Sequence, residues 1–450
     1  MTAPAEGAGE RTAPYPRVLF ITSHAFNKTT GGGVTFTNLF KGWPKDRLAT
    51  VHNDTVPVTT DVCDHYYRLT AAEIRRWPPT TISSGNVSPA PPVEAGASHP
   101  SARQVIQQVI QDGARAAGRW VFGDSLPQSG HLTAGLERWT ADFDPDVIYT
   151  ILGSIGLMEL VEKVQERFAL PLVIHMMDDW PAASFRRGLL APWQRRRMHA
   201  VFARLIDKAS VRMGIGEAMC RAFQESYDLP FVPFQNAVDA STVPRKDPAR
   251  LNDPVRIAYA GSILANAQAK SLAECCQAIA ELNRDGRPVR LDIYSPPFLA
   301  EPHRRDLEVH PAIRLLGPLT DDHEFFATIA AADILLMPVN FDVRSVRFIR
   351  YSMPTRIPAY LAVGTPILVY GPSGIAQVDY AREAGWGLVV DRPGIPGLKA
   401  ALLRLADDAD LRRRVSAAAT RTARKNHDVS EVRQRFRAAL IQAARAPSAG

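Results

Sequence analysis

The sequence contains few cysteines and no long apolar run. Cys63, Cys220, Cys275 and Cys276 are its four cysteines among 450 residues, and they form neither a CxxC pair nor a cysteine–histidine ligand spacing. A disulfide framework and a structural metal site are therefore not expected. No stretch reaches the roughly 18 apolar residues that a membrane-spanning helix needs. The first residues, MTAPAEGAGERTAPYP, lack the apolar segment of a signal peptide, so we expect a cytoplasmic protein.

Charge and composition indicate an ordinary globular protein with an anionic partner. Apolar residues make up 46% and charged residues 22% of the chain, and the net charge is +7. The length suits two domains, each with its own core. Basic residues gather between positions 185 and 213, where they alternate with leucine, tryptophan and phenylalanine. This region is interpreted either as a solvated helix face or as a peripheral contact with anionic lipid on the inner face of a membrane; no nucleic-acid partner is expected.

Short apolar strands alternate with helical patterns along both halves of the chain. Strands are predicted at 18–22, 49–52, 147–150, 172–175, 213–215 and 231–234, and then at 256–259, 289–294, 313–316, 334–337 and 367–370. Such alternation predicts parallel sheets covered by helices on both faces. The fold class is therefore α/β, with two tandem doubly wound (Rossmann-like) domains facing a cleft. Ligands bind such sheets at the carboxyl ends of the strands.

The irregular segments divide the chain. We expect a disordered tail over 1–16, a first domain over 17–240 and a mobile insert at 82–102, where proline, serine and glycine are frequent. The segment 241–254, STVPRKDPARLNDP, carries charge and proline without periodicity and is predicted to be a linker. A second domain then covers 255–425.

The segment 352–374, SMPTRIPAYLAVGTPILVYGPSG, is the most informative part of the sequence. It predicts a polar turn, a helix over 355–363, a Gly-Thr-Pro break and a buried strand. The first turn of a helix offers unpaired N–H groups and a positive dipole end, which together can hold a phosphate. Arg356 belongs to that predicted first turn. The alternative is an ordinary amphipathic helix followed by a core strand.

Three motifs together resemble the GT-B glycosyltransferases, in particular their family-4-like retaining members. They are NAVD at 236–239, YAGSI at 259–263 and PTRIPAYLAVGTPIL at 354–368. The resemblance implies a nucleoside diphosphate sugar as co-substrate, bound mainly by the second domain, and no cofactor. It implies a small-molecule, glycan or lipid-linked acceptor bound mainly by the first domain, and a final helix over 426–450 that crosses back to that domain.

The resemblance also implies site residues. His175 would close a strand at the cleft and touch hydroxyls of the donor sugar. Apart from the resemblance, Asp178 follows His175 and is expected to coordinate an acceptor amine. Alternatives for Asp178 and its neighbour Asp179 are a divalent cation site or a helix cap. The donor-binding residues implied are Gly32, Gly33, Ser262, Lys270, Gly317, Arg347, Ser352 and Arg356.

The sequence departs from the family pattern in three places. Ser262 stands where members usually have an arginine, so we expect one of Arg344, Arg347 and Arg350 to supply the missing charge. Tyr351 and Ala359 stand where members commonly carry two glutamates. His24, at the end of the first strand, faces the cleft in this interpretation.

These residues predict a glycosyltransferase that transfers a sugar to a hydroxyl or amine with retention, in polysaccharide, glycolipid or glycosylated natural-product assembly. Stabilisation of the leaving diphosphate by Lys270 and Arg356 would drive it. The alternatives are an inactive GT-B protein that serves as a partner or glycan-binding subunit, and a nucleotide-sugar epimerase. A dinucleotide oxidoreductase is a further alternative, because Asp54 lies near the distance expected for a ribose-binding carboxylate.

Overall fold

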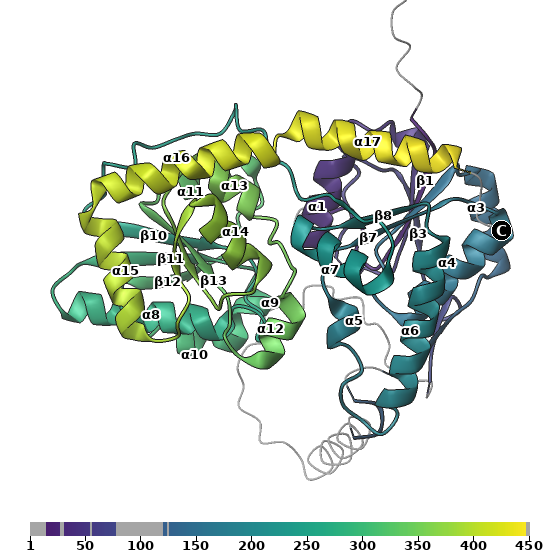
Figure 1. Ribbon diagram of the computed structural model, residues 1–450, viewed down its shortest axis with the longest axis horizontal. Coiled ribbons are helices and arrows are strands. Elements are labelled where there is room, and N and C mark those ends of the chain that lie inside the picture. The colour runs from purple at the N-terminus through teal and green to yellow at the C-terminus, as the bar shows by residue number, and fades with distance from the viewer. Residues whose placement is uncertain (1–14, 28–30, 55, 78–119, 124–125, 447–450) are drawn as a thin grey trace, which may run out of the picture.

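The computed structural model describes residues 15–27, 31–54, 56–77, 120–123 and 126–446. The predicted insert 82–102, and the predicted tail apart from its last two residues, lie outside these ranges. Figure 1 shows two α/β halves next to each other, with the last two helices running along one side of both. No helix in the described part of the chain is both long and apolar enough to cross a membrane.

The first half contains a sheet of seven parallel strands in the order β3-β2-β1-β6-β7-β8-β9. Its strands are β1 (Val18–Thr22), β2 (Leu48–His52), β3 (His65–Arg68), β6 (Val147–Thr150), β7 (Leu172–Met176), β8 (Val211–Gly214) and β9 (Val232–Pro233). The helices around it are α1 (Gly31–Phe40), α3 (Ala134–Phe143), α4 (Ile155–Phe168), α5 (Trp180–Ala183), α6 (Ala191–Lys208) and α7 (Glu217–Tyr227). A small antiparallel pair, β4 (Ile74–Arg76) and β5 (Gln128–Gly130), stands apart.

The second half contains six parallel strands in the order β12-β11-β10-β13-β14-β15. They are β10 (Val255–Ala260), β11 (Val289–Tyr294), β12 (Ile313–Leu316), β13 (Ile334–Pro338), β14 (Ile367–Tyr370) and β15 (Gly387–Val390). The helices are α8 (Ala269–Arg284), α9 (Pro297–Ala300), α10 (Arg304–Leu307), α11 (Asp322–Ala331), α12 (Val343–Ile349), α13 (Ile357–Val363), α14 (Ala376–Ala384), α15 (Ile395–Asp407), α16 (Ala409–Asn426) and α17 (Val429–Arg445). The fold class predicted from the sequence is confirmed.

Each sheet separates two apolar cores, because alternate residues of a strand point to opposite faces. In β1, Leu19 and Ile21 pack with α4 and α6, whereas Val18 and Phe20 pack with α1 and α17. Both faces are covered, so all five residues of β1 and all five of β13 are buried. This burial explains why the central strands read as continuous apolar runs in the sequence.

The chain crosses between the halves twice, and the two crossings lie side by side. Val238 donates its N–H to the carbonyl of His427 at 2.9 Å, and Val238 and Asp428 form a parallel β-bridge. Beyond this point α17 packs against α1, β6, β7 and β8 of the first half (Figure 1). Its Phe436 ring contacts Phe40 at 5.0 Å between centroids. The chain end is therefore part of the first core.

Gly32 and Gly33 lie in the first turn of α1. Two local predictions need correction. The helix expected from residue 355 begins at Ile357, because Pro354 and Pro358 restrict the turn before it. The terminal helical run is broken between α16 and α17, where the Asp428 side chain caps the second helix.

Candidate functional site

The turn 352–356 of the second half lies against the carboxyl ends of strands in the first half. Ser352 Oγ donates a hydrogen bond to Asp178 Oδ1, two residues after β7. Asn236 Nδ2 donates to the Thr355 carbonyl at 2.9 Å. A Cβ atom added to Gly31 would lie 3.5 Å from Thr355 Oγ1. Residues from α1, β7 and the second half therefore converge on one interdomain site.

Arg356 is the charged side chain buried at this site. It is the residue before α13, and only 9% of it is exposed. Its Nε and Nη2 have no hydrogen-bond partner. The guanidinium carbon lies 4.7 Å from the centre of the Tyr259 ring, in the geometry of a cation–π contact. A buried cation without a carboxylate is costly and is well suited to receive an anion.

The other two arginines in the buried set donate hydrogen bonds to backbone carbonyls. Arg412 is 3% exposed and donates to the carbonyls of Pro248, Ala249, Leu405 and Ala406. Arg212 is 9% exposed and donates to the carbonyls of Ile206 and Asp207. Among the buried arginines that the structure describes, Arg356 alone thus has guanidinium nitrogens left without an acceptor.

Gly261 is necessary for the position of Arg356. Its φ is +151°, and an added Cβ would lie 2.1 Å from Arg356 Nη1. The carbonyl of Ser262, in the same turn, accepts a hydrogen bond from the Tyr259 hydroxyl at 2.5 Å. Tyr259 was not singled out from the sequence, although it belongs to the YAGSI motif. It supplies the ring that supports the guanidinium.

Asp178 and Asp179 follow β7 and have different partners. Burial raises the pKa of Asp178, against the opposing effects of the Ser352 hydrogen bond and the His24 imidazole. Asp179 accepts from the Ala182 N–H at 3.2 Å and caps α5, which confirms the cap predicted for one of the two residues. Among the described residues, no group of three or more His, Cys, Asp or Glu side chains is arranged to bind a metal ion.

The glycines at the start of α1 border the same region. A Cβ added to Gly32 would lie 3.7 Å from His24 Cβ, so His24 packs directly over the first turn of α1. At Gly33 an added Cβ would overlap the Asn27 side chain, at 2.3 Å. Both glycines thus permit close contact within the first domain, and His24 acts electrostatically on Asp178.

The prediction that His175 lies in the cleft is wrong. The side chain is fully buried, with its Nδ1 2.6 Å from the Tyr149 hydroxyl and its Nε2 3.1 Å from the Phe234 carbonyl. A carbonyl only accepts, so Nε2 carries the proton and Nδ1 accepts from Tyr149. Burial lowers the pKa of His175 to about 4. The alternation of β7 points His175 into the core, and Asp178 is the cleft residue that follows this strand.

Lys270 and Gly317 lie apart from Arg356. The Lys270 side chain is 70% exposed and pairs with Asp342 at 3.6 Å. Gly317 follows β12, an edge strand, and so stands two strands away from the Gly261 turn that follows β10. Gly261 and Arg356 are therefore in direct contact, whereas Lys270 is paired with Asp342 and Gly317 follows a strand two places away.

The three arginines before the Ser352 turn are exposed on or next to α12. Arg350 lies with its guanidinium carbon 5.2 Å from the centre of the Tyr351 ring, and it acts electrostatically on Asp179. Arg347 faces Arg195 of α6, whose pKa it helps to lower beyond the effect of burial. Arg344 is exposed. Helix α12 packs against α5 of the first half, so these charges line the rim of the interdomain contact.

The positions of the two absent glutamates are occupied by packing side chains. Tyr351 is partly buried against the core of the first half, together with Met353. Ala359 is 8% exposed within α13. Tyr351 thus contributes to the contact between the halves, which a glutamate would make less favourable because it would bury a charge.

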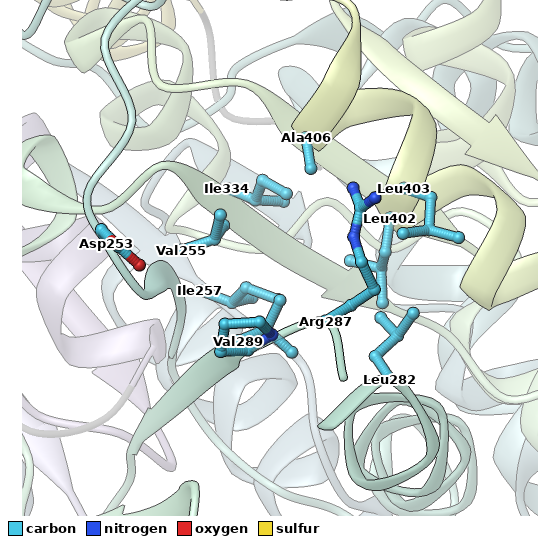
Figure 2. Close-up of a pocket in the computed structure, with 11 residues that line it drawn as sticks. Asp253, Val255, Ile257, Leu282, Arg287, Val289, Ile334, Leu402, Leu403 and Ala406 are labelled. Atoms are coloured by element: carbon cyan, nitrogen blue, oxygen red, sulfur yellow. The ribbon is translucent and has the colours of Figure 1, made fainter. Parts of the chain in front are cut away.

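A further cavity lies at the other end of the second sheet (Figure 2). It is lined by Val255, Val289 and Ile334, which begin β10, β11 and β13, and by Leu402 and Ala406 of α15. These are amino ends of strands, whereas ligands of doubly wound sheets bind at the carboxyl ends. This cavity is therefore not part of the interdomain site.

No family model and no curated protein matches this sequence. Solved structures do match it. Sucrose-phosphate synthase from Thermosynechococcus elongatus aligns with a TM-score of 0.61 and 12% identity, over 93% of this chain and 97% of that one. Anabaena HepE in complex with UDP and glucose gives 0.60 and 12%, over 95% and 100%. The chain has the GT-B fold. WaaG, a glycosyltransferase involved in lipopolysaccharide biosynthesis, gives 0.55 and 14%, over 96% and 100%.

The GT-B resemblance predicted from the three motifs is thus confirmed as a fold. In this fold the Ser352 turn, Arg356 and Gly261 belong to the second domain, and Asp178, His24 and α1 to the first. At identities of 10 to 14% the likeness extends to the fold alone.

Proposed function

We propose that the protein is a glycosyltransferase that transfers a sugar from a nucleoside diphosphate sugar to a hydroxyl or amine, with retention. Such a reaction serves polysaccharide, glycolipid or glycosylated natural-product assembly. The observation that carries the proposal is the Arg356 guanidinium, buried at the carboxyl end of β10 with two nitrogens lacking an acceptor. Solved GT-B structures with this likeness contain UDP and UDP-glucose, which supports a nucleotide-sugar donor.

Each residue of the site has a role in this proposal. Arg356 neutralises the leaving diphosphate, and Lys270 adds a second cation once its side chain leaves Asp342. Ser352 lies between the donor side in the second domain and the acceptor side in the first domain, because its hydroxyl donates a hydrogen bond to Asp178. Asp178, whose pKa is raised by burial, orients the acceptor hydroxyl or amine. His175 serves the fold of the first domain and takes no part in the reaction.

The first-domain side also offers a pocket for an acceptor. It is lined by Leu126, Gln128, Gly153, Ser154, Ile155, Trp180, Ser184 and Phe185. Gly153 and Ser154 follow β6, so this pocket opens at the carboxyl edge of the first sheet, next to α5. Trp180 Nε1 is buried there without a hydrogen-bond partner. A sugar hydroxyl could accept from this N–H, which favours a carbohydrate or glycolipid acceptor.

The test is donor binding followed by turnover. We expect a nucleoside diphosphate sugar to raise the melting temperature by mass action, and release of the free nucleoside diphosphate to depend on acceptor. UDP-glucose is the first donor to try, because HepE is solved with it. Absence of any donor-dependent shift across uridine, guanosine, adenosine and thymidine diphosphate sugars would contradict the proposal.

Two alternatives are distinguished by the same assays. A putative UDP-N-acetylglucosamine 2-epimerase from Listeria monocytogenes aligns with a TM-score of 0.51. An epimerase would convert the sugar with no net release of nucleoside diphosphate. An inactive GT-B partner that has lost its donor site would show neither binding nor release. The unpaired guanidinium of Arg356 argues against an inactive partner, because a buried charge that binds no ligand lowers the stability of the fold.

A further inference from the structure

The basic residues of α6 fall into two groups with different surroundings. From Arg197 onward the basic residues are paired: Arg197 with Glu159 at 2.5 Å, Arg204 with Glu162 at 2.7 Å and Lys208 with Glu166 at 2.9 Å. All three glutamates belong to α4, so these charges are neutralised within the first domain. The region 185–213 does not present one uniform basic face, and a contact with lipid over its whole length is not supported.

Trp193, in the first turn of α6, is one of four large exposed apolar side chains in this region. Trp77, Trp120, Leu189 and Trp193 are 62%, 68%, 60% and 51% exposed. We call these four residues the tryptophan patch. Leu189 donates its N–H to the Trp120 carbonyl at 3.0 Å, and the Trp77 and Phe122 rings meet at 6.0 Å between centroids. Segments distant in the sequence thus bring the patch together.

Exposed arginines flank the residues of the tryptophan patch in the sequence. Arg75 and Arg76 precede Trp77, Arg187 precedes Leu189, and Arg196 follows Trp193. All four are exposed and form no salt bridge with another residue that the structure describes. Residues 184–200 contain five arginines and no Asp or Glu. A surface of this kind is complementary to a partner that is anionic over a wide area.

We propose that the tryptophan patch docks the protein on the surface of an anionic lipid bilayer. Tryptophan rings are stable at the depth of the headgroups, where their apolar face is buried and the indole N–H stays hydrated. Each arginine near an anionic surface adds to the attraction. In Figure 1 the end of α6 that begins with Ala191 lies on the side of the first half opposite α17, so docking there leaves α17 free.

The patch adjoins the acceptor pocket described above, which links docking to substrate class. Phe185 and Ser184 of that pocket directly precede the arginines of the 184–200 segment, and Gln128 of the pocket pairs with Arg76 between β5 and β4. Docking would therefore place the pocket next to the headgroup layer. Resting on the proposed function, this placement assigns a lipid-linked acceptor, reached from the membrane.

The test is co-sedimentation of the full-length protein with vesicles of phosphatidylcholine alone or with 30% phosphatidylglycerol added, roughly the anionic content that makes basic clusters bind. We expect wild-type protein to sediment with the anionic vesicles. The variant Arg76→Glu/Arg187→Glu/Arg196→Glu should bind them on the order of a hundredfold more weakly, and the Arg→Lys triple variant should bind like wild type. Trp120→Ser/Trp193→Ser should also weaken binding.

Matched controls lie in the second domain. Arg421→Glu/Arg424→Glu/Lys425→Glu on α16 changes the net charge by the same amount, and Phe298→Ser removes an aromatic ring that is 69% exposed. We expect both to bind vesicles like wild type. Equal loss of binding in the α16 variant would overturn the proposal, because attraction would then follow net charge alone. Preservation of the melting temperature shows that each variant is folded.

Two further outcomes would overturn the docking proposal. One is a wild-type protein that stays in solution with every kind of vesicle. This result would mean that another segment or a second copy of the chain covers the patch. The other is equal binding to neutral and anionic vesicles. Donor-dependent thermal shift is measured on the same variants and should not change. Its absence in wild type would contradict the proposed transferase while leaving vesicle binding intact, so the two failures are distinguishable.

Discussion

Replacing Arg356 by methionine should separate donor binding from stability. Methionine retains the apolar stem and approximate length but removes the charge. In the free protein the guanidinium has one cation–π contact with Tyr259 and two unpaired nitrogens.

The expected magnitudes follow from these contacts. Loss of a desolvated cation–π contact costs about 2 kcal/mol, whereas removal of an unpaired buried charge relieves a penalty of several kcal/mol. The melting temperature of the free Arg356→Met variant should therefore stay unchanged or rise. A charge-assisted contact to the diphosphate contributes about 1.5 to 3 kcal/mol, so donor affinity should fall roughly tenfold to a hundredfold.

Thermal shift measures both effects in one experiment. At a donor concentration of about 100 times the wild-type Kd, binding stabilises by about 2.7 kcal/mol. In the variant the same concentration should give between about 0.4 and 1.4 kcal/mol. The matched control is Arg412→Met, which leaves four carbonyls without their donor. It should lower stability by about 3 to 5 kcal/mol and leave donor affinity per folded molecule intact.

The reasoning would be refuted by the reverse pattern. If Arg356→Met lowers the melting temperature as much as Arg412→Met and binds donor like wild type, Arg356 is a structural residue. The guanidinium would then have partners in solution that satisfy it in the absence of any anion. Isothermal titration with the nucleoside diphosphate alone checks the affinity independently of stability.

Three further predictions concern the same site and the first-domain core. Gly261→Ala should push Arg356 aside and abolish the donor-dependent shift in melting temperature. The control Gly286→Ala, also at positive φ but with open space around it, should strain its turn and keep that shift. An equal donor-dependent shift in the two variants would contradict the close approach of Gly261 to Arg356. Asp178→Asn keeps an acceptor for the Ser352 hydroxyl and should lower turnover roughly a hundredfold at unchanged donor affinity, as a kinetic assay at saturating donor would show. Because the folded-state pKa of His175, about 4, lies below its unfolded value of 6.5, the stability contributed by its neutral form is complete above pH 6.5 and is lost as the pH falls towards 4. His175→Gln should therefore flatten the pH dependence of the melting temperature between these values, and an unchanged slope would show that His175 is not the group titrating.

The sequence predicted the central strands well because parallel sheets bury both faces. The strands at 147–150 and 367–370 are fully buried apolar runs and have the bounds that were predicted. Edge strand β3, by contrast, reads HYYR and is partly exposed, so no apolar run indicated it. Short α5 lies within an irregular segment and depends on the Asp179 cap.

The sequence also predicted the residues that the second half contributes to the site. The Ser352 turn and Arg356 were selected from their motif, and both lie at the contact between the halves. What the motif could not indicate is the state of Arg356. Its burial, its stacking on Tyr259 and its unpaired nitrogens depend on β10 and on the Gly261 turn, nearly a hundred positions earlier in the chain.

His175 and Asp178 illustrate the limit of position along a strand. His175 lies in β7 and Asp178 follows the strand by two residues, and the sequence favoured the histidine as the cleft residue. The direction of a side chain at a strand end depends on pleat and register, and here β7 pairs with β8 so that His175 faces Tyr149 and Phe234. Three residues later, Asp178 accepts a hydrogen bond from Ser352 of the other half.

The basic region shows the same division between sequence and structure. The sequence alone determined that arginines and aromatic residues gather between 185 and 213, and that the chain folds as two doubly wound halves, because both follow from local composition and from periodicity. Only the tertiary structure decided which of those charges are paired with α4 and which surround the tryptophan patch. Pairing and exposure depend on residues that are distant in sequence and adjacent in space, and periodicity carries no information about such neighbours.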